Sequence, residues 1–228
     1  MSTANLYAKN GEDEKLWEAY NNLLISKDIG RLQKLNVRYD IFRETLNVPG
    51  SIVECGVFKG AGLMHWLKLL KIYAPHEKKT VFGFDTFSSF SNELEDYEKE
   101  TAKSFINEAE FMGVDKENLE KLILSYGFEN FELVEGEVSR TIPEFVQSMP
   151  GLRLSLVNLD FDTYRGTKTA LENFFPIMSP GAILILDEYG KKGWGESDAV
   201  DEFIKEKKLR IEAVRHSNQP TAIIRISN

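Results

Sequence analysis

With 228 residues, of which 42% are hydrophobic, the chain is long enough for one α/β domain with an N-terminal extension. Its formal net charge of −8 and its scattered basic residues argue against a nucleic-acid-binding protein. No apolar run reaches the roughly 18 residues of a membrane span, and the polar N-terminal residues do not resemble a secretory signal. The single cysteine, Cys55, excludes an intrachain disulfide. We therefore expect a cytoplasmic protein without a membrane partner.

The elements predicted in chain order begin with helices over residues 11–47, where apolar side chains recur at helical spacing, and a turn at 47–50. Beyond this turn, short apolar runs alternate with helical stretches. Strands are predicted at 51–55, 80–85, 131–136, 154–160 and 182–190. Helices are predicted at 63–73, 101–111, 115–126, 140–149, 166–178 and 196–207, before a closing hairpin of 209–214 and 221–226. We therefore predict a helical extension over residues 1–50 and one main domain over residues 51–228.

Strands that alternate with helices indicate an α/β fold, in which a mostly parallel sheet is covered by helices on both faces. The interior strands are apolar almost throughout, as burial on both faces requires. Ligands of such folds bind at the carboxyl ends of the strands, near the point where the strand order reverses. The polar residues that follow the strands are therefore the candidate functional residues.

The first two predicted strands end in features that nucleotide sites often contain. The turn Gly56-x-x-x-Gly60-x-Gly62 lets a ligand approach the backbone closely, but the same glycines also suit a plain strand-to-helix turn. Asp85 ends the second strand, where an acid commonly accepts hydrogen bonds from ribose hydroxyls; a solvated or helix-capping aspartate is the alternative. The pattern G-x-G-x-x-G is absent, which argues against a nucleotide-dependent oxidoreductase.

Acidic residues follow the fourth and fifth predicted strands. One helix joins these strands, so we expect them to lie side by side and parallel, with Asp160, Asp187 and Glu188 converging. Converging carboxylates repel one another unless a cation joins them, and oxygen ligands favour Mg²⁺, Mn²⁺ or Ca²⁺ over zinc. Helix capping or exposure to water is the alternative for these acids. Asp162 stands where the chain turns into a loop, so it either faces a ligand of the metal as a general base or caps the next helix.

The segment 86–100 is longer than a simple connection and rich in acidic residues. We expect either a lid over an acceptor site, assisted by the N-terminal helices, or a solvated acidic loop. Phe87, Tyr189 and Trp194 flank the expected site, where they either stack on an acceptor or pack in the core.

Four blocks of the sequence resemble a known family: VECGVFKGAG, FGFDTFSSF, VEGEVSRTIP and LDFDTYRGTKTALENFFPIMSPGAILILDEYG. Over about residues 51–204 the chain is similar to the macrocin O-methyltransferase, or TylF-like, family. The resemblance implies a Rossmann-like class I methyltransferase fold with a mostly parallel seven-stranded sheet. It also implies an enzyme that uses S-adenosyl-L-methionine (SAM) and Mg²⁺, or another hard divalent cation, to methylate a hydroxyl of a sugar or glycosylated small molecule.

The resemblance further implies a role for each candidate residue. Asp160, Asp187 and Glu188 would be the metal ligands, and Asp162 the base that removes the hydroxyl proton. The implied SAM-binding residues are Glu54, Gly56, Lys59, Gly60, Asp85, Thr86, Gly136, Glu137 and Asp160. Glu54, Gly56 and Gly60 would line the methionine end of SAM. Asp85 would bind the ribose hydroxyls, and Gly136 and Glu137 would lie near the adenine.

Three departures from the family pattern bear on these roles. Glu188 stands where the family usually has an aspartate, Lys59 replaces an arginine and lacks its planar fork, and Ala61 interrupts the glycine pair. A catechol-type O-methyltransferase, which needs the same cation chemistry, and a SAM-binding protein without turnover remain alternatives. Members of the family usually self-associate, so we expect a homo-oligomer, a dimer or larger.

Overall fold

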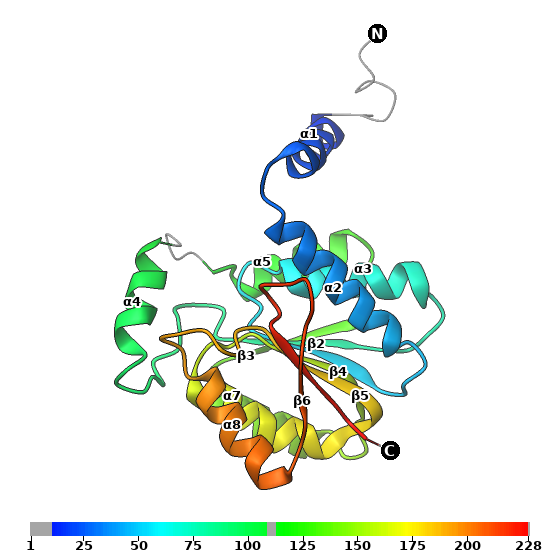
Figure 1. The fold of residues 1–228 in the computed structure, drawn as a ribbon. Coiled ribbons are helices and arrows are strands. Elements are labelled where there is room, and N and C mark those ends of the chain that lie inside the picture. The colour runs from blue at the N-terminus through cyan, green and yellow to red at the C-terminus, as the bar shows by residue number, and fades with distance from the viewer. Residues whose placement is uncertain (1–10, 109–112, 228) are drawn as a thin grey trace.

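The computed structural model describes residues 11–108 and 113–227 as layers of helices around a sheet (Figure 1). Its helices are α1 (Gly11–Ile25), α2 (Gly30–Glu44), α3 (Ala61–Tyr73), α4 (Lys99–Glu108), α5 (Lys116–Ser125), α6 (Val138–Ser148), α7 (Tyr164–Phe174) and α8 (Glu196–Lys207), with a 3₁₀ turn η2 (Phe175–Ile177). Its strands are β1 (Ser51–Cys55), β2 (Val81–Asp85), β3 (Phe131–Glu135), β4 (Leu154–Leu159), β5 (Met178–Leu186), β6 (Ile211–Ala213) and β7 (Ala222–Arg225).

One seven-stranded sheet runs through the described residues, in the order β3-β2-β1-β4-β5-β7-β6. The pairs among β1 to β5 are parallel, and β7 is antiparallel to both of its neighbours, β5 and β6. The strand order reverses between β1 and β4, which places a ligand site at their carboxyl ends. The mostly parallel sheet and the closing antiparallel hairpin were both predicted, and both are confirmed.

Helices cover both faces of the sheet. On one face α6, α7 and α8 contribute Ile142, Phe174 and Phe203 to the core. On the other face α2 and α3 contribute Phe42 and Trp66, and α5 packs beside them. Strand β4, between the two layers, is buried at every residue, which explains why its sequence is apolar except for Ser155 and Asn158. Burial of each large side chain of this kind contributes about 1.5–3 kcal/mol to stability.

Some predicted boundaries are wrong, and one of them bears on the site. The fifth strand, predicted at 182–190, spans Met178–Leu186, because the turn-type residues Pro180 and Gly181 hide its beginning. Asp187 and Glu188 therefore follow the strand instead of lying within it. The helix predicted at 166–178 begins earlier, at Tyr164, and gives way to η2 and β5. The end of the helix predicted at 101–111 lies outside the described residues.

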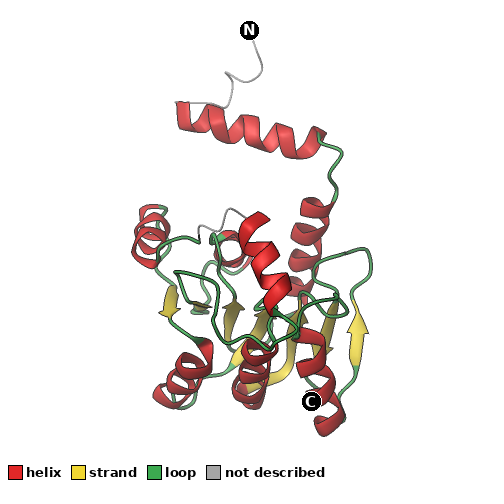
Figure 2. Cartoon of the chain, turned by 90° about the vertical axis from the view of Figure 1, so that its left-hand side faces the viewer, coloured by secondary structure: helices red, strands yellow, loops and turns green. Residues whose placement is uncertain are grey.

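The two helices of the predicted N-terminal extension differ in their packing. Helix α1 stands away from the sheet and exposes Leu16, Tyr20 and Ile25 (Figures 1 and 2). Helix α2 buries Ile41 and Phe42 in the core on the α3 side of the sheet. The boundary at residue 50 stays a prediction, but α2 shares the core of the main domain. None of the helices in the described ranges has both the length and the hydrophobicity of a membrane-spanning segment.

His65 on α3 makes this packing testable. Its ring stacks on Trp66 with centroids 5.8 Å apart, and burial, together with the cations Arg38 and Lys68, lowers its pKa to about 4. The unfolded chain protonates a histidine near pH 6.5. Between these two values the unfolded state binds the proton and the folded state does not, so the free energy of unfolding falls as the pH decreases from about 6.5 to about 4.

We expect His65→Gln to flatten this part of the pH dependence, because it removes the group that titrates. Urea unfolding between pH 4 and pH 7.5 measures the free energy of unfolding of wild type and variant. His76→Gln, in an exposed loop, is the matched control. The account of His65 is wrong if the stability of wild type and His65→Gln changes in parallel across this range.

Candidate active site

A cavity of about 320 Å³ opens at the carboxyl ends of the central strands. Its walls come from the segments that follow the parallel strands and from the start of α2. The predicted site residues on its wall are Gly56, Asp85, Thr86, Glu137, Asp160, Asp162 and Glu188. A second hollow, of about 610 Å³, lies at the amino ends of β1, β2 and β4 and contains none of the predicted residues. The first cavity is therefore the candidate site.

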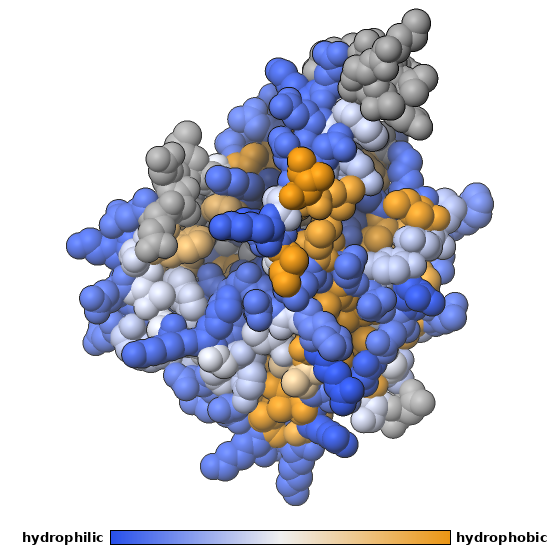
Figure 3. Space-filling view, turned by 45° about the horizontal axis from the view of Figure 1, so that its top comes forward, coloured by the Kyte–Doolittle hydropathy of each residue, from blue (hydrophilic) through white to orange (hydrophobic). Residues whose placement is uncertain are grey.

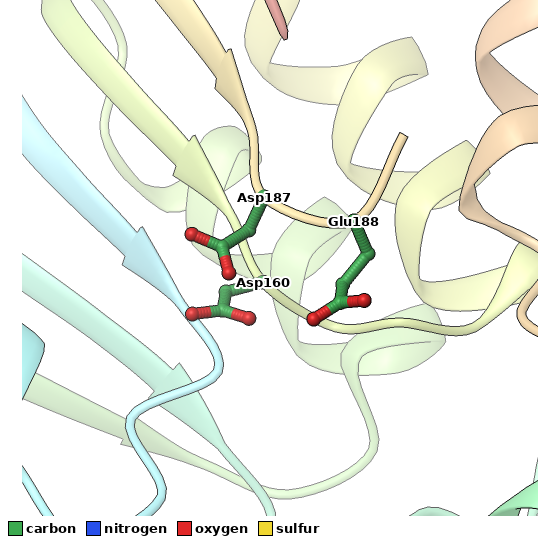
Figure 4. A group of neighbouring side chains, drawn as sticks. All are labelled: Asp160, Asp187 and Glu188. Atoms are coloured by element: carbon green, nitrogen blue, oxygen red, sulfur yellow. The ribbon is translucent and has the colours of Figure 1, made fainter. Parts of the chain in front are cut away.

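The three acids that follow β4 and β5 converge as predicted. One carboxylate oxygen from each of Asp160, Asp187 and Glu188 lies within 4.8 Å of the others (Figure 4). The strand register explains this, because Leu159 of β4 pairs with Leu186 of β5 and the next residues stand side by side. Asp187 and Glu188 are buried, whereas Asp160 is half-buried. The carboxylate cluster is confirmed, and a metal ion in it stays a prediction.

Two cations on α2, which no sequence pattern had indicated, reach this cluster. Nζ of Lys34 lies 2.8 Å from Oδ2 of Asp187 and 3.4 Å from Oδ2 of Asp160. Arg38, one helical turn later, lies 3.4 Å from Asp160 and 3.8 Å from Asp187. Burial acts to lower the pKa of Lys34, but the two carboxylates outweigh it and hold that pKa above its ordinary value. The available signal was a lysine and an arginine four residues apart on one face of a core-packing helix.

Glu54, expected at the methionine end of SAM, lies behind the cluster and off the cavity wall. It accepts a hydrogen bond of 2.6 Å from Nε1 of Trp66, and its other oxygen lies 3.3 Å from Arg38. The Arg38 guanidinium also lies 5.3 Å from the centre of the Trp66 ring. Gly62 makes room for this group, since a Cβ there would lie 1.9 Å from Oε1 of Glu54. Glu54 therefore fixes Arg38, and a contact between Glu54 and SAM stays a prediction.

Asp162 lies on the cavity wall in a strained backbone conformation. Strand β4 ends before it, as predicted, and its φ of +64° falls in the left-handed region that favours glycine. Its carbonyl accepts a hydrogen bond of 3.0 Å from the backbone N–H of Glu196, which holds the turn. Burial, together with the carboxylates of Asp160 and Glu188, raises the pKa of Asp162 well above its ordinary value, and Lys191 opposes the shift. The turn thus presents a basic carboxylate to the cavity.

Glu188 is held from three directions. Its Oε1 accepts hydrogen bonds from Nζ of Lys191, at 2.8 Å, and from the side-chain amide of Gln219, which also lines the cavity. Its backbone N–H donates to Oε1 of Glu196 at 3.0 Å. Glu196 is fully buried, and its other oxygen has no hydrogen-bond partner in the described part of the chain. Burial, with Asp162 nearby, raises the pKa of Glu196 well above its ordinary value. Through the N–H of Glu188 and its own backbone N–H on Asp162, Glu196 joins the two loops.

The glycine turn after β1 is tight because β4 passes close to it. Gly56 has a φ of +85°, and a Cβ there would lie 2.0 Å from the carbonyl oxygen of Asp160. The Asp85 carboxylate accepts hydrogen bonds of 2.8 Å from the backbone N–H groups of both Val57 and Phe58. Asp85 therefore organises the turn in addition to lining the cavity. Its predicted contact with a ribose stays a prediction.

Besides Glu54, three residues of the predicted SAM-binding set are not on the cavity wall. Lys59 is exposed, with Nζ 5.2 Å from the centre of the Phe58 ring. Gly60 precedes α3 with a φ of +84° and packs against α5. Gly136, with a φ of +126°, donates its N–H to the carbonyl of Asp85 at 3.0 Å. Gly60 and Gly136 thus shape the loops that form the wall, and contacts of the three residues with SAM stay predictions.

The segment after β2 forms one side of the cavity. Glu137 accepts hydrogen bonds from Oγ of Ser91 at 2.7 Å and from the N–H of Asn92 at 3.2 Å. Glu98, which is fully buried, accepts one of 2.7 Å from the N–H of Tyr164 at the start of α7. The expectation of a solvated acidic loop is therefore wrong for Glu98. A lid-like motion of the segment stays a prediction.

Aromatic side chains cover the cavity on this side. Phe90 stacks on Trp194 with centroids 5.8 Å apart, and Phe105 meets Trp194 edge-on at 6.2 Å. Phe58, Phe90 and Phe105 all line the cavity. Phe87, by contrast, packs in the core. The cavity is thus lined by aromatic side chains as well as by the acids.

The carboxylate cluster fits a hard divalent cation in its chemistry. The donors are all oxygens, and Oδ1 of Asp187 is buried without a hydrogen-bond partner in residues 11–108 and 113–227. Burial, with the adjacent Asp187, raises the pKa of Asp160 to about 8, so Lys34 and Arg38 do not fully offset the cost of holding this carboxyl ionised. Lys34, however, bonds both aspartates. The residues therefore fit a cation once Lys34 gives way.

Comparisons with known proteins agree on one family. The sequence model described as macrocin-O-methyltransferase (TylF) matches residues 11–219. The 8-demethyl-8-(2,3-dimethoxy-alpha-L-rhamnosyl)-tetracenomycin-C 4'-O-methyltransferase of Streptomyces olivaceus is 30% identical over 145 residues, covering 62% of this chain and 54% of that protein. The mycinamicin III 3''-O-methyltransferase of Micromonospora griseorubida is 27% identical over 147 residues, covering 62% and 56%. The chain spans about half the length of these curated relatives.

Solved structures share the fold. The apo structure of CalS11, described as a TDP-rhamnose 3'-O-methyltransferase of calicheamicin biosynthesis, has a TM-score of 0.69 at 26% identity, covering 93% of this chain and 87% of that one. The O-methyltransferase NovP has a TM-score of 0.72 at 20% identity, covering 86% and 80%. The predicted class I methyltransferase fold is confirmed.

The hydrogen bond between the N–H of Glu188 and the Glu196 carboxyl can be tested by measuring the stability of Glu196 variants. Glu196→Ala leaves the N–H of Glu188 without its buried acceptor, so we expect the free energy of unfolding to fall by about 1–3 kcal/mol. Glu196→Gln is the matched control, because its amide oxygen can still accept that bond. Urea unfolding of both variants measures the effect, and equal losses in the two would contradict the proposed link.

Proposed function

Because the chain belongs to the macrocin O-methyltransferase family, we propose that it transfers the methyl group of SAM to a hydroxyl of a sugar carried by a small molecule. The family match over residues 11–219 and the relatives named for the methylation of sugar hydroxyls support this activity. The observation that carries the proposal is Asp162, a half-buried carboxylate on the cavity wall next to a carboxylate cluster.

In this proposal SAM occupies the part of the cavity that follows β1, β2 and β3. Gly56 gives access to the backbone, Asp85 and Thr86 accept or donate hydrogen bonds at the ribose, and Glu137 lies toward the adenine. Glu54, Lys59, Gly60 and Gly136 keep their proposed places in the SAM-binding set, with Glu54 acting through Arg38. The tight turn at Gly56 supports this location, because any side chain there would collide with Asp160.

Asp160, Asp187 and Glu188 would hold Mg²⁺ or another hard divalent cation, with Asp160 also adjacent to SAM. When bound, SAM supplies an electrophilic methyl group, and the cation lowers the pKa of a hydroxyl that it coordinates. Glu188 reaches one methylene further than the aspartate usual in the family, and Lys191 and Gln219 hold it in place.

Asp162 would remove the proton of the acceptor hydroxyl. Its burial and its acidic neighbours make it a stronger base than an exposed aspartate. The constrained turn directs it into the cavity, and the bond from Glu196 keeps the turn in place. The aromatic wall of Phe58, Phe90 and Phe105 would exclude water and pack against the C–H face of the sugar or an attached ring.

Self-association and location also belong to the proposal. We propose a homo-oligomer, a dimer or larger, because hydrophobic side chains are exposed on the face that Figure 3 shows. The exposed large hydrophobic residues of α1 and the segment that follows it are Leu16, Tyr20, Leu24, Ile25 and Ile29. The free thiol of Cys55 is buried, which suits the proposed cytoplasmic location. No nucleic acid or membrane partner is part of the proposal.

The activity can be tested by incubating the purified protein with SAM and a panel of rhamnosylated small molecules. We expect S-adenosylhomocysteine and a product 14 mass units heavier with at least one glycoside, lost with EDTA and restored by Mg²⁺. Matched sugar-free aglycones and catechol are the controls. Turnover of catechol alone would favour the catechol-type alternative, and binding of SAM without turnover of any acceptor would favour the non-catalytic one.

Asp162→Asn tests the proposed base. We expect the dissociation constant of SAM to change by less than about twofold and turnover to fall by about 10²–10⁴-fold, the usual contribution of a general base. Calorimetry with SAM and the mass assay above measure the two quantities. Asp162 has no role in proton transfer if the variant turns over at the wild-type rate.

A further inference from the structure

Lys34 lies where a cation bound to the cluster would lie. Its Nζ donates to Oδ2 of Asp187 at 2.8 Å and to Oδ2 of Asp160 at 3.4 Å, so one ammonium joins two of the proposed metal ligands. The inference that follows rests on the proposed function, because it concerns the cation site of that activity.

Arg38 and Lys34 differ in their freedom to leave. The Arg38 side chain is 4% exposed, and Glu54 and the face of Trp66 both hold it. The Lys34 side chain is 27% exposed and lines the cavity. The lysine side chain is a flexible chain of four carbons, and its ammonium is a compact charge that water solvates well once it leaves the cluster. Lys34 can therefore withdraw from the cluster while Arg38 stays.

Among the acids of the site, Lys34 pairs with Asp160 and Asp187, because two neighbouring acids have cations or donors of their own. Arg38 is shared with Glu54, and Lys191 and Gln219 bind Glu188. Lys34 is thus the cation in closest contact with Asp187, at 2.8 Å against 3.8 Å for Arg38. A Mg²⁺ ion binds oxygens at about 2.0–2.1 Å. An ion on the same oxygen of Asp187 would lie within about 5 Å of the ammonium, where the two positive charges repel in this poorly solvated place.

We propose that Lys34 is an internal competitor for the divalent cation. Its ammonium neutralises Asp160 and Asp187 when the ion is absent, and it turns into the cavity when the ion binds. Lys34 therefore raises the ion concentration that the site requires. Lys34 and Arg31 both line the cavity, so the displaced ammonium would face it and could donate to the oxygens of a bound sugar.

Binding of Mn²⁺ to the full chain, measured by calorimetry and by the electron paramagnetic resonance signal of the free ion, tests this proposal. Lys34→Met and Lys34→Gln remove the ammonium and keep a side chain of similar length. Lys27→Met, an exposed lysine between α1 and α2, is the control for the loss of one positive charge. We expect both Lys34 variants to bind Mn²⁺ at least tenfold more tightly than wild type, and Lys27→Met to bind it within twofold.

Thermal unfolding separates competition from a merely structural role. Without Mn²⁺ the Lys34 variants should melt at a lower temperature than wild type, because the two aspartates lose their counter-ion. At saturating Mn²⁺ this difference should close, since the ion replaces the ammonium. A structural role would lower the melting temperature equally in both conditions.

The possible failures are distinguishable. Equal or weaker Mn²⁺ binding by the Lys34 variants would overturn the inference and leave the proposed cation site intact. The absence of Mn²⁺ binding in wild type and in both variants at millimolar concentrations would overturn the inference and the metal part of the proposed function together. SAM binding and sugar methylation would then be tested separately, by calorimetry with SAM and by the mass assay with and without EDTA.

Discussion

Two neighbouring parallel strands end in acidic residues, and the repulsion between those acids has to be offset by positive charge. Asp160 and Asp187 stand side by side because β4 and β5 are in register, and little water reaches Asp187 to screen it. Buried like charges at this separation are unfavourable unless they are paired. Lys34 and Arg38 provide the pairing from α2, so this helix is required by the electrostatics of the site as well as by the core.

The same constraint extends behind the site. Arg38 carries its charge into an apolar layer, where Glu54 and Trp66 hold it. Gly62 at the start of α3 is the consequence, because no side chain fits beside the Glu54 carboxylate. A glycine that resembles part of a cofactor-binding turn is thus explained by a buried ion pair. A glycine in such a turn can therefore be required by packing inside the protein, and not by contact with a ligand.

The loops at the carboxyl ends are held by side chains that the family resemblance connects with SAM. Asp85 bonds the turn after β1, and Glu137 bonds the segment after β2. A carboxylate can accept several hydrogen bonds, so these contacts are compatible with a ligand and also preorganise the cavity. Asp162, Phe58 and Phe87 adopt left-handed backbone conformations around the same edge of the sheet. Strain of this kind persists only where the surroundings enforce it, and it commonly marks functional sites.

The amino-acid sequence by itself determined the order of the elements, the parallel sheet and the meeting of Asp160 with Asp187, since each of these depends on local periodicity and on one short connection between neighbouring strands. It did not locate the start of β5, because the residues Met178–Gly181 are atypical of a strand and their place in the sheet depends on pairing with β4. Only the tertiary structure decided what neutralises the acids. Lys34 is 153 positions from Asp187, so this contact depends on how distant segments pack. Glu196, at the start of α8, accepts the N–H of Glu188 eight residues earlier, a contact that depends on how the intervening loop folds back. A charged side chain looks the same in sequence whether it faces water or a buried partner, and the packing of α2 on the sheet makes that distinction.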